Sequence, residues 1–270
     1  MSPNEVPNLL TIAGTDPSGG AGIQADLKTF SALGTYGMSV ITGLVAQNTR
    51  GVRSVHQVPA SFVTEQLDAV FDDCRVDAVK IGMLATADVI EAVAGVLAAR
   101  RPRYVVLDPV MVAKSGDRLL AADALASLRS TLLPHVDLIT PNLPEAADLL
   151  GVAEASTEAE MRSQLDALVK LGPAVLLKGG HLGGPECPDL LALDASVQPT
   201  RLVAPRIETT SDHGTGCTLS AAIAALRPQR PGWLEAVTDA KAYLTGALTE
   251  AHRLDVGHGH GPVHHFYKWW

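Results

Sequence analysis

The sequence predicts an α/β fold, with residues 1–270 forming a single domain around a mostly parallel central sheet that helices cover on both faces. Short, almost wholly apolar segments alternate along the chain with longer segments of helical spacing. Parallel strands covered on both faces are nearly continuous apolar runs, and a helix usually connects two of them. No repeat, linker-like change of composition or low-complexity tract divides the chain, and α/β domains often exceed ~200 residues.

The first half of the chain predicts strands that alternate with three helices. The strands are short apolar runs, at residues 8–13, 39–46, 53–58, 78–81 and 104–107. The helices are residues 21–33, 61–73 and 88–100. In the second of these helices, Phe62, Leu67 and Val70 recur at helical spacing, which predicts one buried face.

The second half continues the alternation. Its expected helices are residues 123–133, 144–150, 158–171, 216–226 and 233–252. Its expected strands are residues 138–140 and 174–177, followed by an edge hairpin at residues 190–193 and 201–203. Pro144 stands at the start of its helix, where a missing amide hydrogen costs nothing.

Composition and charge restrict the class of protein. Apolar residues make up 47% of the chain, enough for a large core. No apolar stretch approaches the ~20 residues that span a bilayer. The net charge of −8 argues against nucleic-acid and membrane partners, because both require basic surface. The three cysteines are widely spaced and form no disulfide framework. We therefore expect a cytoplasmic protein with a small-molecule ligand.

Polar residues follow most of the predicted strands. Ligands of such folds collect outside the carboxyl ends of the strands. Any one of these residues can be a turn or a helix cap, but their number at one edge of the sheet favours a site. They are residues 15–20, Gln47, Asn48, Thr49, Gly82, Met83, Asp108, Asn142, Glu145 and residues 178–181.

Residues 211–218, which lead into the apolar helix 216–226, are the most informative segment. Gly214 and Gly216 permit backbone angles that turn successive amide groups toward one ligand. A helix N-terminus favours anions, so we expect a phosphate there and a favoured thiolate at Cys217. An ordinary helix N-cap with an inert cysteine stays open as the alternative.

Two common nucleotide-binding motifs do not fit this chain. Residues 20–25 match the G-x-G-x-x-A fingerprint, but no acidic residue occurs between Asp26 and Glu65 to hold a ribose. No Gly-Lys-Ser/Thr sequence follows a predicted strand, which excludes a P-loop.

The chain nevertheless contains the kinds of residue that phosphoryl transfer to an alcohol requires. Such a transfer needs charge neutralisation, alignment and a proton acceptor. Lys178 can reach a phosphate, and Asp108 and Glu145 can hold Mg²⁺, although each carboxylate can also cap a helix. The amides of residues 214–217 can stabilise negative charge, and Cys217 can take the proton. The histidine-rich residues 257–265 predict a packed tail rather than a metal site, since they include no acidic residue or cysteine.

In combination, these segments resemble the ribokinase-like superfamily, and within it the hydroxymethylpyrimidine/phosphomethylpyrimidine kinases of thiamine biosynthesis. The matching segments are residues 13–28, 46–49, 80–84, 107–111, 140–145, 178–181, 213–218 and 257–263. Most ribokinase relatives carry Asp where this chain has Cys217. The cysteine is similar to the pyrimidine-kinase branch and to some pyridoxal kinases.

The resemblance implies a ribokinase-like fold, ATP and Mg²⁺ as cofactors, and phosphorylation of hydroxymethylpyrimidine to the monophosphate and then the diphosphate. It implies that the pyrimidine contacts Gly14, Asp26, Gln47, Met83 and Val110. It implies that ATP contacts Asn142, Lys178 and Asp212, that Mg²⁺ contacts Asp108 and Glu145, and that transfer occurs at Gly214, Thr215, Gly216 and Cys217. Relatives are often dimers, so we expect a homodimer.

The chain departs from the family pattern at one place, and two alternative functions stay open. The family often has Asn-Thr where this chain has Ser211 and Asp212, and a carboxylate there would repel a triphosphate unless a cation compensates. A pyridoxal kinase on the same scaffold is the nearest alternative function. A non-catalytic sensor of the pyrimidine or nucleotide is the other, but Cys217 and Lys178 are both present, as a reactive site requires.

Overall fold

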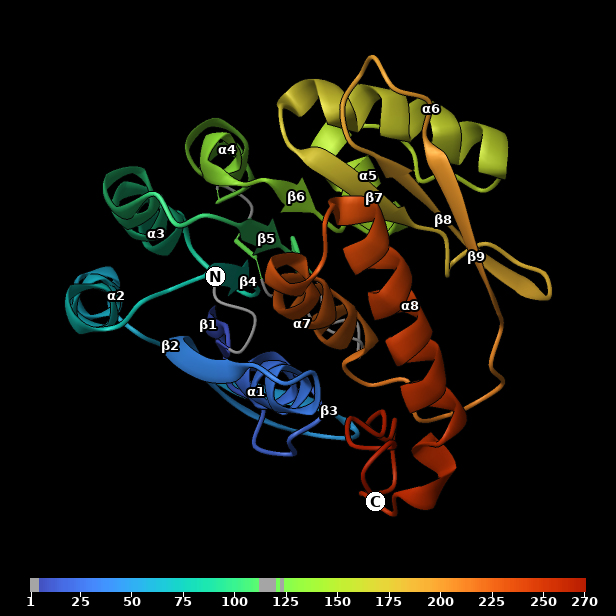
Figure 1. The fold of residues 1–270 in the computed structure, drawn as a ribbon, viewed down its shortest axis with the longest axis horizontal. Coiled ribbons are helices and arrows are strands. Elements are labelled where there is room, and N and C mark those ends of the chain that lie inside the picture. Colours follow the sequence, from blue (N-terminus) through green and yellow to red (C-terminus); the bar gives the residue numbers. More distant parts are fainter. Residues whose placement is uncertain (1–4, 112–119, 122–123) are drawn as a thin grey trace.

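The structure is a computed structural model that describes residues 5–111, 120–121 and 124–270. Within these ranges nine strands form one sheet, in the order β3-β2-β1-β4-β5-β6-β7-β8-β9 (Figure 1). They are β1 (Asn8–Gly14), β2 (Tyr36–Asn48), β3 (Gly51–Gln57), β4 (Ala78–Ile81), β5 (Val105–Leu107), β6 (Leu138–Ile139), β7 (Ala174–Lys178), β8 (Glu186–Ala192) and β9 (Thr200–Pro205). The six central strands are parallel, and β3, β8 and β9 pair antiparallel at the edges. The predicted mostly parallel sheet is confirmed.

Helices cover both faces of the sheet (Figure 1). One face carries α1 (Gly22–Ala32), α7 (Thr215–Leu226) and α8 (Trp233–Thr249). The other carries α2 (Ala60–Asp73), α3 (Ala87–Arg100), α4 (Ala124–Ser127), α5 (Leu143–Leu150) and α6 (Glu158–Leu168). Leu9 and Leu10 of β1 belong to different cores because successive strand residues point to opposite faces.

Helix α7 lies between α1 and α8 on one face of the sheet and packs on β4 and β5. Every residue from Thr218 to Leu226 is buried, as expected of a helix that is apolar all round. Its N-terminus points to the carboxyl ends of the strands, since Gly216 lies next to Asp108 and Lys178, which follow β5 and end β7. No helix within the described ranges is long and apolar enough to cross a membrane.

The expected helix at residues 123–133 differs from the structure. Residue 123 lies outside the described residues, and α4 ends at Ser127. A π-helical turn over Leu128–Leu132 follows, in which the amide of Leu133 donates to the carbonyl of Leu128. Leu128 and Leu133 are both buried, so this turn brings two core side chains to one side.

The C-terminal segment packs on the body of the protein, as predicted. The amide of His260 donates to the carbonyl of Thr49 at 2.8 Å, at the β2–β3 turn. The amide of His264 donates to Ala247 of α8 at 3.0 Å, and His264 and His265 are buried. The tail therefore joins the edge hairpin to the helical layer beside the carboxyl end of the sheet.

Candidate active site

A cavity of about 840 Å³ opens at the carboxyl ends of the parallel strands. Its wall combines residues of β1, β2, β7, β8, α5, α7 and α8 with the loops between them. It includes every site residue predicted from the sequence except Asp26, namely Gly14, Gln47, Met83, Asp108, Val110, Asn142, Glu145, Lys178, Asp212, Gly214, Thr215, Gly216 and Cys217.

Lys178 forms the centre of a charged cluster in this cavity. Its Nζ lies 2.9 Å from Asp108 Oδ1 and 3.9 Å from Glu145 Oε2. Asp108 also accepts a hydrogen bond of 3.0 Å from the hydroxyl of buried Thr140. Opposite charges and burial both fix the lysine, so its ammonium group is held at the end of β7 and faces the cavity.

Asn142 and Glu145 build the start of α5. The Asn142 side chain accepts from the Glu145 amide and the Glu145 carboxylate accepts from the Asn142 amide, each at 2.8 Å. This reciprocal capping box satisfies two free helix amides. Burial raises the pKa of Glu145 to about 7, with Lys178 acting to lower it and Asp108 to raise it. Asn142 and Glu145 therefore both cap α5 and line the cavity.

The two predicted magnesium ligands fit a weakly pre-formed site. No group of three or more His, Cys, Asp or Glu side chains with a metal-binding arrangement occurs among the described residues. Mg²⁺ in kinases is commonly held by one or two carboxylates together with substrate phosphates and water. Asp108 and Glu145, both beside Lys178, are two carboxylates at this cavity.

The N-terminus of α7 forms the predicted amide-lined turn. Gly214 is the N-cap and has φ of 80°, which favours glycine. A Cβ at Gly216 would lie 3.2 Å from Asp108 Oδ2 and 3.5 Å from Lys178 Nζ. The free amides of the first turn therefore lie against the charged cluster, where a helix N-terminus favours an anion.

Cys217 stands in the first turn of α7 but is not a favoured thiolate. Burial raises the pKa of Cys217 to about 11, and the nearby carboxylates of Asp26 and Asp108 also raise it. Lys80 and a hydrogen bond with the Gly22 amide act in the opposite direction without overcoming burial. The expected thiolate is thus wrong for this structure, because desolvation outweighs the helix N-terminus.

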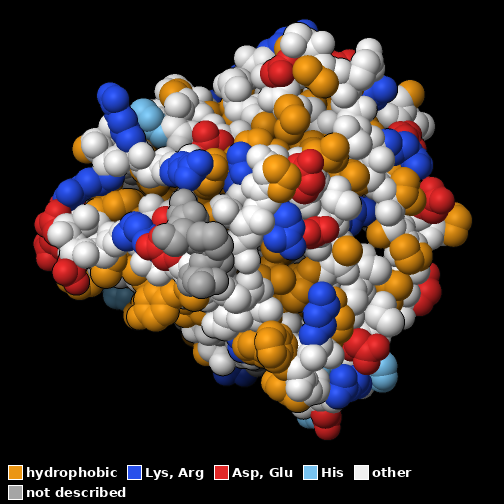
Figure 2. Space-filling model, in the orientation of Figure 1, with side chains coloured by type: hydrophobic (Ala, Val, Ile, Leu, Met, Phe, Trp, Pro, Cys, Tyr) orange, Lys and Arg blue, Asp and Glu red, His pale blue; other side chains and the backbone are white. Residues whose placement is uncertain are grey.

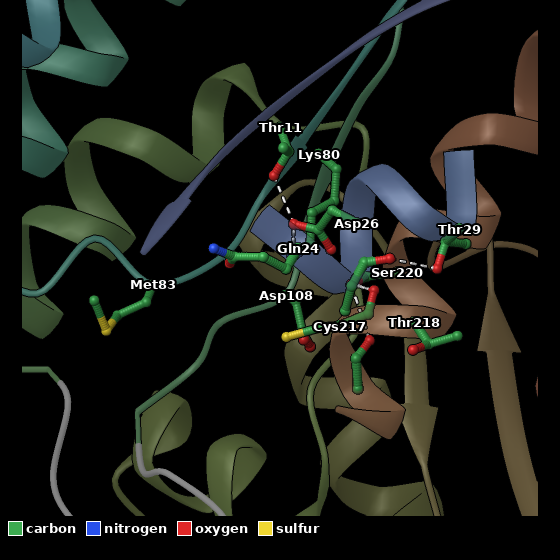
Figure 3. Close-up of polar contacts among 12 residues, drawn as sticks. Thr11, Gln24, Asp26, Thr29, Lys80, Met83, Asp108, Cys217, Thr218 and Ser220 are labelled. Atoms are coloured by element: carbon green, nitrogen blue, oxygen red, sulfur yellow. Dashed lines mark hydrogen bonds and ion pairs between the residues drawn. The ribbon is translucent and has the colours of Figure 1, made fainter. Parts of the chain in front are cut away.

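Asp26 lies behind the cavity wall rather than in it. Its Oδ2 accepts from the Thr11 hydroxyl at 2.6 Å and from Lys80 Nζ at 2.9 Å (Figure 3). Asp26 and Lys80 are fully buried, and Asp26 Oδ1 has no hydrogen-bond partner among the residues that the structure describes. Lys80 itself lines the cavity. Sequence reasoning missed Lys80, although a lysine inside the apolar strand β4 is a signal for a buried ion pair.

The part of the cavity between β1, β2 and the residues after β4, called the slot below, is lined by Gly14, Val45 and Met83. The Met83 methyl group would contact a Cβ placed at Gly14, and would lie 3.3 Å from one placed at Gly43. The hydroxyl of Thr42 donates to the Met83 carbonyl at 2.6 Å. Gln47 lies on the wall of the same cavity. Two glycines thus make room for the Met83 side chain, and Thr42 holds its backbone.

Asp212 has a partner from the C-terminal tail. Its Oδ1 lies 2.8 Å from His260 Nδ1, and both residues line the cavity. A histidine in this position is a candidate for the compensation that the Ser211–Asp212 departure requires.

Further wall residues had no recognisable sequence signal. An apolar patch consists of Leu219 of α7 with Leu244 and Leu248 of α8. Beside it, Lys241 pairs with Asp189, which also accepts from the Gly179 amide at 3.0 Å. These contacts depend on how α8 packs against β8, which local sequence does not specify.

The sequence of this chain is similar to those of known proteins. The family described as phosphomethylpyrimidine kinase matches residues 16–264. A hydroxymethylpyrimidine/phosphomethylpyrimidine kinase of Escherichia coli (strain K12) is 61% identical over 264 residues, covering 97% of this chain and 98% of that protein.

Solved structures of relatives share the fold. The ADP complex of Bacillus subtilis pyridoxal kinase superposes with a TM-score of 0.88 at 37% identity, covering 97% of this chain and 98% of that one. The phosphomethylpyrimidine kinase of Clostridium difficile 630 gives a TM-score of 0.77 at 42% identity, covering 90% and 100%. The ribokinase-like fold is confirmed, and the chain belongs to the phosphomethylpyrimidine kinase family.

Proposed function

We propose that this chain transfers the γ-phosphoryl group of ATP to hydroxymethylpyrimidine, and then to the phosphate of the product, in thiamine biosynthesis. One observation supports this most directly. The cluster of Lys178 and Asp108 meets the first turn of α7 in the same cavity as the slot beside Met83. A phosphate donor and a flat acceptor ring can therefore be held in one chamber that also contains Cys217.

ATP occupies the half of the cavity around Lys178. Lys178, Asn142 and Asp212 line the cavity, and the solved structure of the Bacillus subtilis relative is an ADP complex, which supports the use of a nucleotide. Asp108 and Glu145 would hold Mg²⁺, which neutralises the charge that builds up on the phosphate oxygens during transfer. With a cation beside it, Glu145 ionises more readily than its pKa of about 7 implies.

The pyrimidine occupies the slot, whose wall includes Gly14, Met83 and Val110. Small and apolar walls suit a flat heteroaromatic ring, and the Gln47 amide can both donate to and accept from the ring and its amino group. Asp26 then acts through Lys80, with which it pairs behind the wall, rather than through direct contact.

In the first step the hydroxyl oxygen of the substrate attacks the γ-phosphorus. A new P–O bond forms, the bond to the β–γ bridging oxygen breaks, ADP leaves, and the hydroxyl proton passes to Cys217 Sγ. The amides of residues 214–217 stabilise the negative charge of the transferring group. Lys80 favours the thiolate that this role needs. In the second step a phosphate oxygen attacks, and no alcohol proton has to be removed.

Phosphorylation of pyridoxal is the second candidate function. The pyridoxal kinase of Bacillus subtilis shares the fold over nearly the whole chain, and pyridoxal also carries a hydroxymethyl group on a flat ring. The contacts around Gln47 decide between the two rings.

We also propose a cytoplasmic homodimer, each subunit being one domain over residues 1–270. Leu44 of β2, Val55 of β3 and Phe62 of α2 are exposed apolar side chains near the β3 edge of the sheet. Over the face that carries α1, α7 and α8, Lys and Arg are interspersed with Asp and Glu (Figure 2), as suits a small-molecule enzyme. Light scattering of the purified chain tests the dimer.

ADP release with Mg-ATP tests the function, with hydroxymethylpyrimidine, its monophosphate and pyridoxal as parallel acceptors. Turnover on both pyrimidines is the expected result. Turnover on pyridoxal alone assigns the second function. Ligand binding without any ADP release would overturn both and leave a sensor.

A further inference from the structure

Asp16 is a buried carboxylate in the loop before α1, and five hydrogen bonds hold it. Its Oδ1 accepts from the Ser18 amide at 2.9 Å and the Ser18 hydroxyl at 2.6 Å. Its Oδ2 accepts from the amides of Gly20 at 3.1 Å and Ala21 at 2.8 Å. The fifth partner is distant in sequence, since His213 Nε2 lies 2.7 Å from Oδ2. No side-chain oxygen of Asp16 is left unsatisfied.

The negative charge of the Asp16 carboxylate determines which ring nitrogen of His213 carries a hydrogen. Burial acts to raise the pKa of Asp16, but the hydrogen bonds from His213 and Ser18 lower it to about 2. An ionised carboxylate only accepts hydrogen bonds, so Nε2 of His213 must carry a hydrogen and donate it. The pair is therefore a directed, charge-assisted hydrogen bond, which is stronger and more specific than a neutral one.

The two loops that this bond joins approach each other closely. A Cβ at Gly214 would overlap the carbonyl oxygen of Gly20, and a Cβ at Gly20 would press on the imidazole of His213. Only glycines permit this distance. The loop before α1 is thus fitted directly against the N-cap of α7.

The contact between the loop before α1 and the N-cap of α7 lies next to the proposed reaction centre. His213 immediately precedes Gly214, and the Gly22 amide at the start of α1 hydrogen-bonds Cys217. On its other side, His213 donates its amide to the carbonyl of Gly261 in the C-terminal tail at 3.0 Å. The position of α7's first turn therefore depends on a bond between two residues 197 positions apart.

We propose that Asp16 and His213 are a positioning pair, which aligns the amides of residues 214–217 and the Cys217 thiol with the phosphoryl group in both transfer steps. Neither residue has to touch a reacting atom. This inference rests on the proposed function of the α7 turn. A displacement of about 1 Å at a transfer site costs on the order of a hundredfold in rate, so a bond that sets this position is expected to affect kcat.

The test compares two substitutions of one residue. His213→Gln keeps an N–H donor at a similar reach from the backbone, whereas His213→Met removes the donor and keeps the volume. Asp16→Asn removes the charge of the acceptor. Asp137→Asn is the matched control, because Asp137 likewise binds a backbone amide, that of Val105 at 2.7 Å, but lies outside the cavity.

We expect His213→Met and Asp16→Asn to lower kcat roughly tenfold or more in both steps, with the KM for ATP and acceptor changed less than about threefold. His213→Gln and the control should stay close to wild type. The double variant Asp16→Asn/His213→Met should lose no more than either single one, since both break the same bond. If His213→Met does not fold, His213→Asn, whose amide is too short to reach Asp16, replaces it with the same expected loss.

Three outcomes overturn the pair. They are equal loss in the Gln and Met variants, a rise in KM with unchanged kcat, and wild-type rates in His213→Met and Asp16→Asn. Wild-type activity on the pyrimidines separates this inference from the proposed function. An inactive wild type would refute the function, whereas an active wild type with unaffected variants would refute only the pair.

Discussion

The ammonium group of Lys80 in β4 lies 2.9 Å from the carboxylate of Asp26 in α1, and neither side chain is exposed to solvent. This ion pair joins the sheet to the helix behind the cavity. Burial raises the pKa of Asp26, and Lys80 counteracts this effect. Removing Lys80 would leave a buried carboxylate whose Oδ2 keeps only the Thr11 hydroxyl.

Lys80→Met is therefore expected to lower the free energy of unfolding by about 3–5 kcal/mol, the usual cost of breaking a buried ion pair. Urea denaturation measures it. Arg100→Met is the control, because Arg100 pairs with Asp68 and Asp72 at the surface, where solvent screens an ion pair and leaves it a small net contribution to stability. Equal losses in the two variants would show that the burial of the pair does not matter. Asp26→Asn added to Lys80→Met should recover part of the loss.

The rate of the first phosphoryl transfer should rise with pH. The pKa of Cys217 is raised to about 11, so the thiolate fraction grows about tenfold per pH unit throughout the neutral and mildly alkaline range. Single-turnover rates between pH 7.5 and 9.5 on hydroxymethylpyrimidine should show this slope. The monophosphate, whose phosphate is already ionised, should not.

Cys217→Ala should abolish the slope and most of the first step while sparing the second. A variant that loses both steps equally would contradict the role of Cys217 as base. The role would also be contradicted if the wild-type transfer rate rose with pH equally steeply for hydroxymethylpyrimidine and for its monophosphate.

Gly43→Ala should weaken binding of the acceptor without changing that of ATP. The new Cβ would lie 3.3 Å from the Met83 methyl group and push that side chain into the slot. We expect the KM for hydroxymethylpyrimidine to rise roughly threefold to tenfold. Adding Met83→Ala to Gly43→Ala should remove this steric conflict and bring the KM for hydroxymethylpyrimidine back down. Gly95→Ala is the control, since a Cβ there meets nothing within 4 Å; a similar rise in this variant would refute the steric explanation.

Lys178→Met should lower kcat/KM for ATP roughly a hundredfold, because the cation then no longer faces the transferring charge. It should also raise the pKa of Glu145, which Lys178 now lowers. The Mg²⁺ concentration for half-maximal rate should therefore increase, and should fall again as pH rises and Glu145 ionises. Steady-state titrations of ATP and Mg²⁺ measure both effects. Lys170→Met, at an exposed position, should behave as wild type, and an unchanged kcat/KM for ATP in Lys178→Met would remove Lys178 from the transfer site.

Local patterns in the sequence were sufficient to predict the parallel sheet and the edge at which the site lies. Residues that end or follow strands, such as Asp108 and Lys178, meet in one cavity because the carboxyl ends of parallel strands share an edge. The glycines around Cys217 likewise predicted the amide-lined turn at Gly214.

Properties that depend on the approach of distant segments could not be predicted. Asp26 lies on α1 as expected, but only tertiary packing decides that it faces Lys80 and not the cavity. The pKa of Cys217 depends on burial, which a helix N-terminus motif does not report. His213 has no partner within its own segment, since Asp16 is brought to it by the packing of α1 against α7.

The most direct test of the account is a phosphorus NMR time course of the wild-type protein with Mg-ATP and hydroxymethylpyrimidine. We expect the monophosphate to appear first and then to convert to the diphosphate, with one ADP formed in each step. A reaction that stops at the monophosphate, or that forms no phosphorylated pyrimidine, would contradict a two-step kinase built on one transfer site.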